Sequence, residues 1–261
     1  MDWRYTRLER QDGVALLTMD NPATANAMDE DLGPELVRAL EGLALDDQVG
    51  ALVLTGAGPV FSGGGNVIKA HQYLEDHPGQ GASPVFEAYT KWVSRVIVAL
   101  TSMPQPVVAA VNGAASGAGF AWMLASDLVL AAEGARIVPG FLAIGLVPAA
   151  GMTVGLGRLL GRLRAADILM LNRGLDPREA LELGLLDRVT APETLREEAL
   201  ALAGELARGP RRALAATKAL LGRAARQGLY PQLERERRAV MLAADQPDFA
   251  QRARRFARKK T

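Results

Sequence analysis

A long stretch without charge constrains the fold of this chain more than any other feature. No charged residue occurs between Arg95 and Asp127. The stretch is interrupted by prolines and glycines, and its first half is rich in β-branched residues while its second half is rich in small ones. These interruptions argue against a membrane-spanning helix, although the length would suffice for one. We therefore expect a buried strand at Pro106–Val111, then a buried helix, and no association with a membrane.

Two glycine-rich turns follow apolar, β-rich runs. The run Ala51–Thr55 leads into Phe61-Ser62-Gly63-Gly64-Gly65-Asn66, and the run Pro106–Val111 leads into Asn112-Gly113-Ala114-Ala115-Ser116-Gly117-Ala118-Gly119. Glycine has no Cβ, so a ligand oxygen can closely approach the backbone N–H groups of such turns. Two turns of this kind predict a pair of N–H donors, the simplest device for holding an enolate or a tetrahedral oxyanion.

Apolar runs alternate with helical periodicity through most of the chain, which predicts an α/β fold with buried strands. After about Pro192 the pattern becomes almost entirely helical. We expect residues 1–191 to form the core and residues 192–261 to form a helical region that supports oligomerisation. Residues 68–84 are polar and mixed, which predicts a mobile or variable segment. The expected strands are 5–9, 14–19, 51–55, 106–111 and 127–132, and the expected helices are 29–45 with Asp29 as N-cap, 86–100, 119–126 and 152–160.

Composition excludes several classes of function. The net charge of +1 argues against binding of nucleic acid or another polyanion by the protein as a whole. The lack of cysteine excludes disulfides, thiolate metal sites and cysteine nucleophiles, and it fits a reducing compartment. The two histidines, His71 and His77, would lie on different sides of a helix, so we expect no metal site. The N-terminus carries charges at once and lacks an apolar segment, so we expect a cytoplasmic protein without a secretory signal.

The glycine turns do not match other common anion-binding motifs. Gly117-Ala118-Gly119 lacks the third glycine of a dinucleotide-binding turn, and no lysine and hydroxyl residue stand in phosphate-loop spacing. Ser62 and Ser116 have no histidine close in sequence and no nucleophile-elbow pattern around them. We therefore do not expect a nucleotide-binding protein or a serine hydrolase.

The two turns and their neighbours together resemble the crotonase (enoyl-CoA hydratase/isomerase) superfamily over essentially the whole chain. The matching segments are Asn26–Met28, Leu52–Gly56, Phe61–Asn66, Pro104–Gly113, Ser116–Gly119, Ser126–Leu128, Gly145–Pro148, Gly184–Val189 and Phe256–Lys260. The resemblance implies a crotonase-like spiral of ββα units with a helical C-terminal region. It also implies a homotrimer, or two trimers paired into a hexamer.

The resemblance further implies an acyl-CoA thioester as substrate, and no cofactor apart from the coenzyme A that the substrate carries. In the superfamily two backbone N–H groups hold the thioester carbonyl, and by motif position these belong to Gly65 and Ala118. A helix N-terminus, where Ala118 is expected, favours developing negative charge. Lys69 and the basic run 252–260 are candidates for binding the CoA phosphates, and the alternative is that they are ordinary surface residues. The implied substrate-binding positions are Ala25, Ala27, Gly64, Asn66, Val67, Ile68, Lys69, Gly117, Ala121, Phe141 and Ala149.

The chain departs from the superfamily where carboxylates are expected. Hydratases of the superfamily place glutamates at the positions of Ala121 and Phe141, and several isomerases place an acid at the position of Ala149. Water addition needs a general acid and a general base, so simple hydratase activity is not expected. The segment Val138–Thr153 most resembles the phenylacetate-pathway ring isomerases, which tend to have an aromatic residue near Phe141 but normally keep an acid at the position of Ala149. Candidates for the missing group are His71, Tyr73, Glu75, Asp76, His77, Glu87 and Tyr230.

Three functions fit these residues. The first is an acyl-CoA enzyme that stabilises an enolate between Gly65 and Ala118, in an isomerase or hydratase-like reaction. The second is a catalytically silent homologue that binds acyl-CoA or a partner enzyme. The third is a thioester hydrolase, for which no nucleophile can be placed. We favour the first, because the oxyanion-binding turns are intact.

Overall fold

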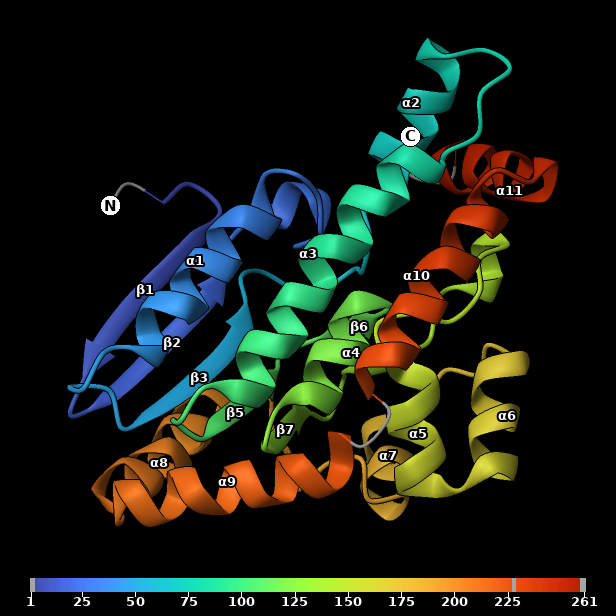
Figure 1. The fold of residues 1–261 in the computed structure, drawn as a ribbon. Coiled ribbons are helices and arrows are strands. Elements are labelled where there is room, and N and C mark those ends of the chain that lie inside the picture. The colour runs from blue at the N-terminus through green and yellow to red at the C-terminus, as the bar shows by residue number, and fades with distance from the viewer. Residues whose placement is uncertain (1–2, 227–228, 259–261) are drawn as a thin grey trace.

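The strands of the chain form two sheets (Figure 1). The computed structural model describes residues 3–226 and 229–258. In the larger sheet β1 pairs antiparallel with β2, and the later pairs are parallel. The smaller sheet is parallel. The larger sheet has the order β1 (Thr6–Gln11), β2 (Val14–Met19), β3 (Ala51–Gly56), β5 (Val107–Val111), β7 (Leu128–Ala132), β9 (Arg188–Thr190), and the smaller has β4 (Val60–Ser62), β6 (Ala114–Ser116), β8 (Arg136–Val138).

Each central strand of the larger sheet leads into a strand of the smaller sheet and then into helices. β3 leads into β4 and later α3 (Ser83–Ser102), β5 leads into β6 and α4 (Ala118–Ala125), and β7 leads into β8 and later α5 (Met152–Leu160). Parallel pairing stacks these units on one another. The expected α/β spiral of ββα units is therefore confirmed.

The remaining helices are α1 (Leu32–Ala44), α2 (Val67–Asp76), α6 (Arg162–Met170), α7 (Pro177–Glu182), α8 (Leu195–Arg208), α9 (Arg211–Arg226), α10 (Leu229–Ala244) and α11 (Pro247–Arg258), with 3-10 turns at Pro22–Thr24 and Leu142–Ile144.

The central strands are buried on both faces because helices cover both. Alternate side chains of a strand point to opposite faces of its sheet. In β3, Leu52 and Leu54 pack in the core that includes α1, α3 and α4, while Ala51 and Val53 pack against α8. This double burial explains why the strands read as continuous apolar runs rather than as alternating ones.

The predicted elements lie within three residues of the observed bounds, and the N-cap expected for the first helix is wrong. The segment expected to be mobile or variable, 68–84, contains most of α2 and the start of α3. Asn66 caps α2, because its side-chain oxygen accepts a hydrogen bond from the Lys69 N–H (3.2 Å). Helix α1 begins at Leu32, so Asp29 is not its N-cap, although its carboxylate accepts from the Leu32 N–H (3.1 Å).

Helix α10 is attached to the rest of the protein through a buried carboxylate. Glu236 accepts hydrogen bonds from the Gly151 N–H and the Thr153 hydroxyl, at the N-terminus of α5. A carboxylate is favourable there, because the first amides of a helix lack internal partners. The same helix lies alongside α3 (Figure 1). No helix within the described ranges has both the length and the apolarity to span a bilayer.

Candidate active site

The two glycine turns meet in the folded chain. Gly64 has φ +91° and Gly117 has φ +52°, which are backbone conformations that favour glycine. A Cβ on Gly64 would lie 2.8 Å from the Ser116 carbonyl oxygen, and a Cβ on Gly117 would lie 3.6 Å from the Gly64 Cα. The turns therefore touch backbone to backbone, at a separation that leaves little room for side chains.

The Gly65 N–H has a fixed direction. The Gly64 carbonyl accepts a hydrogen bond from the Met28 N–H at 2.6 Å. In a trans peptide the N–H points opposite to the C=O, so the Gly65 N–H points away from Met28. It has no hydrogen-bond acceptor within the described part of the chain.

The Ala118 N–H is fixed in the same way from the other turn. Ala118 is the first residue of α4, and the Gly117 carbonyl accepts a hydrogen bond from the Ala121 N–H at 3.1 Å. The Ala118 N–H therefore points out of the N-terminal end of the helix, where the first amides lack partners and the helix dipole favours negative charge. Like the Gly65 N–H, it has no acceptor among the residues that the structure places.

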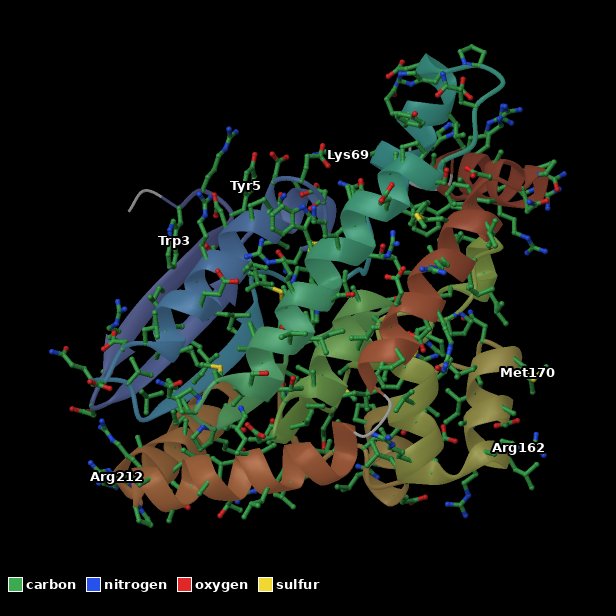
Figure 2. All side chains as sticks on the ribbon, in the orientation of Figure 1. Trp3, Tyr5, Lys69, Arg162, Met170 and Arg212 are labelled. Atoms are coloured by element: carbon green, nitrogen blue, oxygen red, sulfur yellow. The ribbon has the colours of Figure 1, made fainter. Side chains whose placement is uncertain are left out.

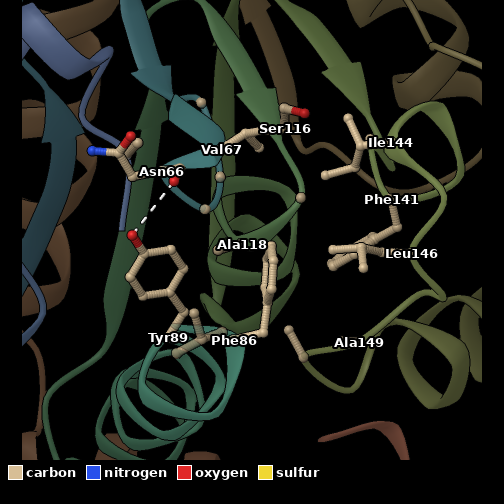
Figure 3. Close-up of a pocket in the computed structure, with 18 of the residues that line it drawn as sticks. Asn66, Val67, Phe86, Tyr89, Ser116, Ala118, Phe141, Ile144, Leu146 and Ala149 are labelled. Carbon is tan, nitrogen blue, oxygen red and sulfur yellow. Dashed lines mark hydrogen bonds between the residues drawn. The ribbon is translucent and has the colours of Figure 1, made fainter. Parts of the chain in front are cut away.

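Both residues line a cavity of about 410 Å³ whose wall is mainly apolar. Figure 3 shows Phe86 and Tyr89 reaching up from α3 at the bottom of the view, and Phe141, Ile144 and Leu146 on its right-hand side. Among the lining residues that the structure describes, none is Asp, Glu or His, and Arg237 is the one charged side chain. Arg237 pairs with Glu234 (2.9 Å) and Glu87 (3.5 Å).

All but two of the predicted site residues line this cavity. The first exception is Ala121, which is buried in the core beside Phe120 and Trp122. The second is Lys69, whose ammonium group contacts Asp29, Glu30 and Asp31 at 3.2, 2.9 and 2.8 Å; Figure 2 shows it at the outer edge of the molecule. The predicted residues in the lining are Ala25, Ala27, Gly64, Gly65, Asn66, Val67, Ile68, Gly117, Ala118, Phe141 and Ala149.

The side chains considered as substitutes for the carboxylates lie elsewhere. Tyr73 stacks on His77 with 4.2 Å between ring centroids, and Glu75 faces Arg254 at 3.6 Å, in the described part of the basic run. Glu87 pairs with Arg237. Tyr230 lies outside the residues whose side chains the structure describes. None of the other candidates is part of the cavity lining in the described chain; these are His71, Tyr73, Glu75, Asp76, His77 and Glu87.

A buried polar cluster lies behind the first turn. The Asp29 carboxylate accepts hydrogen bonds from the Asp31 and Leu32 N–H groups and from the Asn66 amide (3.0 Å). Burial alone would raise the pKa of Asp29, but these hydrogen bonds, led by that of Asn66, and the Lys69 ammonium hold it below its usual value. Burial alone would lower the pKa of Lys69, but the carboxylates of Asp31, Glu30 and Asp29 raise it. Asp29 and Lys69 are therefore ionised at neutral pH, and their cluster connects α1 to the turn.

Sequence reasoning missed the part of the wall that α3 and α10 contribute. Phe86, Tyr89 and Val93 follow one another at helical spacing on α3. This apolar stripe, which includes two aromatic residues, was the sequence signal that could have indicated this part of the wall. Leu233 and Val240 reach the cavity from α10. No local pattern distinguishes them from ordinary apolar residues of a helix, because only the tertiary packing of α10 beside α3 brings them there.

Comparison with known proteins agrees with this geometry. The family model described as "Enoyl-CoA hydratase/isomerase" matches residues 9–261. The chain belongs to the enoyl-CoA hydratase/isomerase family. It is 32% identical to the 1,2-epoxyphenylacetyl-CoA isomerase of Escherichia coli strain K12, over 100% of this chain and 97% of the relative. It is also 32% identical to 4-chlorobenzoyl coenzyme A dehalogenase-2 of an Arthrobacter species, over 98% and 91%.

The fold agrees with solved structures of the same family. The crystal structure of an enoyl-CoA hydratase from Mycobacterium avium subsp. paratuberculosis K-10 matches with a TM-score of 0.85 and 30% identity, over 96% of this chain and 98% of that one. A monofunctional enoyl CoA isomerase from M. smegmatis matches with a TM-score of 0.72 and 31% identity, over 86% and 95%. Family members named as hydratases and as an isomerase therefore share this fold.

The close contact between the turns leads to a prediction about stability. In this family member, Gly64→Ala places a Cβ against the Ser116 carbonyl at a positive φ. We expect it to lower the free energy of unfolding by about 2–4 kcal/mol, from backbone strain together with overpacking. Urea unfolding measures the loss. Gly157→Ala in α5 is the matched control, because a Cβ there meets no atom of the described chain within 4 Å, and a loss as large in the control would contradict the assigned cause.

Proposed function

We propose that this protein binds an acyl-CoA thioester in the cavity and stabilises its enolate between the N–H groups of Gly65 and Ala118. The observation that carries the proposal is that two unpartnered backbone donors, on turns in contact, lie at one apolar cavity. Donors held in place act strongly on developing negative charge where water is excluded. The names of the Escherichia coli and Arthrobacter relatives, which specify CoA thioesters, support this substrate class.

The described wall of the cavity lacks the side chains that hydration uses. Hydration needs a water molecule that is activated by a base and a separate acid for the α-carbon. The described lining contains no carboxylate or imidazole to serve either role. Isomerisation also needs a base, which takes a proton from one carbon of the acyl group and returns it to another, but it adds no water, and its enolate is the species that the two N–H groups would hold. The described lining supplies no carboxylate or imidazole for that proton, so the proposed shift of a double bond uses a proton carrier from outside it, such as a solvent water. The relative named as a monofunctional enoyl CoA isomerase supports this reaction class.

The same lack of acid and base side chains supports a second candidate, a homologue that binds acyl-CoA without turning it over. One experiment separates the two. Purified protein is given a panel of enoyl-, dienoyl- and β-ketoacyl-CoAs, each followed by chromatography of the products, and binding is measured by calorimetry. We expect at least one dienoyl- or enoyl-CoA to be isomerised without net water addition. Tight binding with no turnover of any member would instead establish the silent homologue.

We further propose that residues 192–261 contribute a surface for a second and third copy of the chain. Leu220 and Leu221 on α9 are 65% and 68% exposed, and adjacent exposed leucines favour burial by a partner. This supports the proposed trimer or hexamer, whereas the division of the chain near residue 191 and a cytoplasmic location are proposed from the sequence alone. Light scattering of the purified protein tests the assembly.

A further inference from the structure

Tyr89 is the phenol in the cavity wall, and its ring faces Gly65, which carries the first N–H donor. It is 3% exposed and belongs to α3. A Cβ on Gly65 would lie 3.6 Å from the Tyr89 Cδ2 atom, so only about one carbon atom would fit between the glycine and the ring. Phe86 holds the ring edge to face, with centroids 5.8 Å apart. The ring therefore limits how far Gly65 can move toward α3.

The Tyr89 hydroxyl contacts the residue that follows the donor. It donates to the Asn66 carbonyl at 3.4 Å, the dashed line in Figure 3, which is long for an O–H···O hydrogen bond. Asn66 is otherwise anchored at every polar group. Its N–H donates to the Met28 carbonyl (2.9 Å), its amide donates to Asp29 (3.0 Å), and its two oxygens accept from the N–H groups of Lys69 and Ala70.

The phenol keeps its proton at neutral pH. Burial raises the pKa of Tyr89 above its usual value, and the negative charges of Glu30 and Asp29 raise it further, against a smaller opposing effect of the Lys69 ammonium. A neutral phenol donates a hydrogen bond but does not act as a base. Its role in the cavity must therefore be one that a donor and an aromatic ring can fill.

We propose that Tyr89 is a positioning residue for the Gly65 N–H. Its ring stands behind the glycine and its hydroxyl holds the Asn66 carbonyl, so that the donor stays aimed at the thioester oxygen. The polar cluster of Asp29 and Lys69 fixes the turn from the α1 side, and Tyr89 fixes it from the α3 side. Such precision matters because a donor displaced by about 1 Å can cost on the order of 100-fold in rate. The inference rests on the proposed function.

The test measures the donor directly. A saturated acyl-CoA with carbon-13 at the thioester carbonyl is bound to the protein, and infrared difference spectroscopy records the carbonyl stretch. In the wild type we expect a shift to lower frequency, because hydrogen bonding polarises the carbonyl. Tyr89→Phe removes only the hydroxyl and should reduce the shift, with about 3- to 10-fold lower kcat, the effect of one hydrogen bond, little change in KM and an unchanged Tm. Tyr89→Leu also removes the aromatic ring, so it should reduce the carbonyl shift and kcat further.

A control variant and two distinct outcomes separate failure of the proposed function from failure of the role of Tyr89. Tyr73→Phe is the matched control, because its hydroxyl bonds Gln80 at 3.2 Å outside the cavity, and it should keep the full shift. No carbonyl shift in the wild type would overturn the proposed function and, with it, this role of Tyr89. A wild-type shift that persists unchanged in folded Tyr89→Phe and Tyr89→Leu, with kcat unchanged, would overturn the role of Tyr89 alone.

Discussion

Replacing Ala118 by proline is expected to lower kcat about 10²- to 10³-fold, the usual effect of removing one oxyanion donor, while the protein stays folded. Proline has no N–H, so the substitution deletes the donor itself. Ala118 is the first residue of α4, and proline is well tolerated at the first position of a helix, where the N–H makes no helical hydrogen bond. The measurement is kcat on the best substrate of the panel, with circular dichroism and Tm as checks on folding.

Two further variants separate the lost hydrogen bond from the bulk of the proline ring. Ala118→Gly keeps the N–H, so kcat should stay within about 3-fold of the wild type. The substitution should lower stability by only about 1 kcal/mol, the usual cost of glycine in a helix. A backbone ester, made by incorporating lactic acid in place of Ala118, removes only the N–H and should reproduce the loss seen with proline. Full activity of the ester variant would contradict a donor role for Ala118.

The parts of the site that local sequence could predict are those that local chemistry determines. Gly64 and Gly117 stand where backbones approach closely, and the apolar runs of β3, β5 and β7 are strands buried between helices. The strands of the smaller sheet were not predicted. β4, β6 and β8 are three residues each, so they carry no periodicity and exist because parallel pairing stacks one ββα unit on the next.

Other features escaped prediction because distant segments create them. The mixed composition of 68–84 did not predict helix α2, which is capped by Asn66 and packs against α11. Arg237 is separated from Gly65 by most of the chain and reaches the same cavity. Glu236 explains how α10 is held there, but its partners at Gly151 and Thr153 are unrecognisable without the fold. Local patterns thus predicted the two glycine turns, the resemblance to the superfamily singled out Gly65 and Ala118 within them, and tertiary packing supplied most of the wall around them.

The Asp29 cluster gives the largest expected effect on stability, about 3–5 kcal/mol for Asp29→Ala, because a buried carboxylate that accepts three hydrogen bonds is lost. The substitution removes an acceptor for the Asp31 and Leu32 amides and for the Asn66 side chain, and it leaves Asn66 buried with a donor unsatisfied. Urea unfolding at pH 7 measures the loss. Asp31→Ala is the matched control, because Asp31 is 42% exposed and pairs with the same Lys69, and an exposed pair contributes about 0–1 kcal/mol.

The contribution of Asp29 should also depend on pH in a defined direction. Its pKa is lower in the folded protein than in the unfolded chain, where it is about 4. The carboxylate therefore stabilises the fold fully above about pH 4 and loses this effect as the pH falls through the folded-state pKa. The stability difference between wild type and Asp29→Ala should be large and constant from pH 6 to 8 and should shrink below about pH 4. A difference that stays constant down to pH 3, or an equal loss in Asp31→Ala, would show that the ionised Asp29 does not hold the first turn in place.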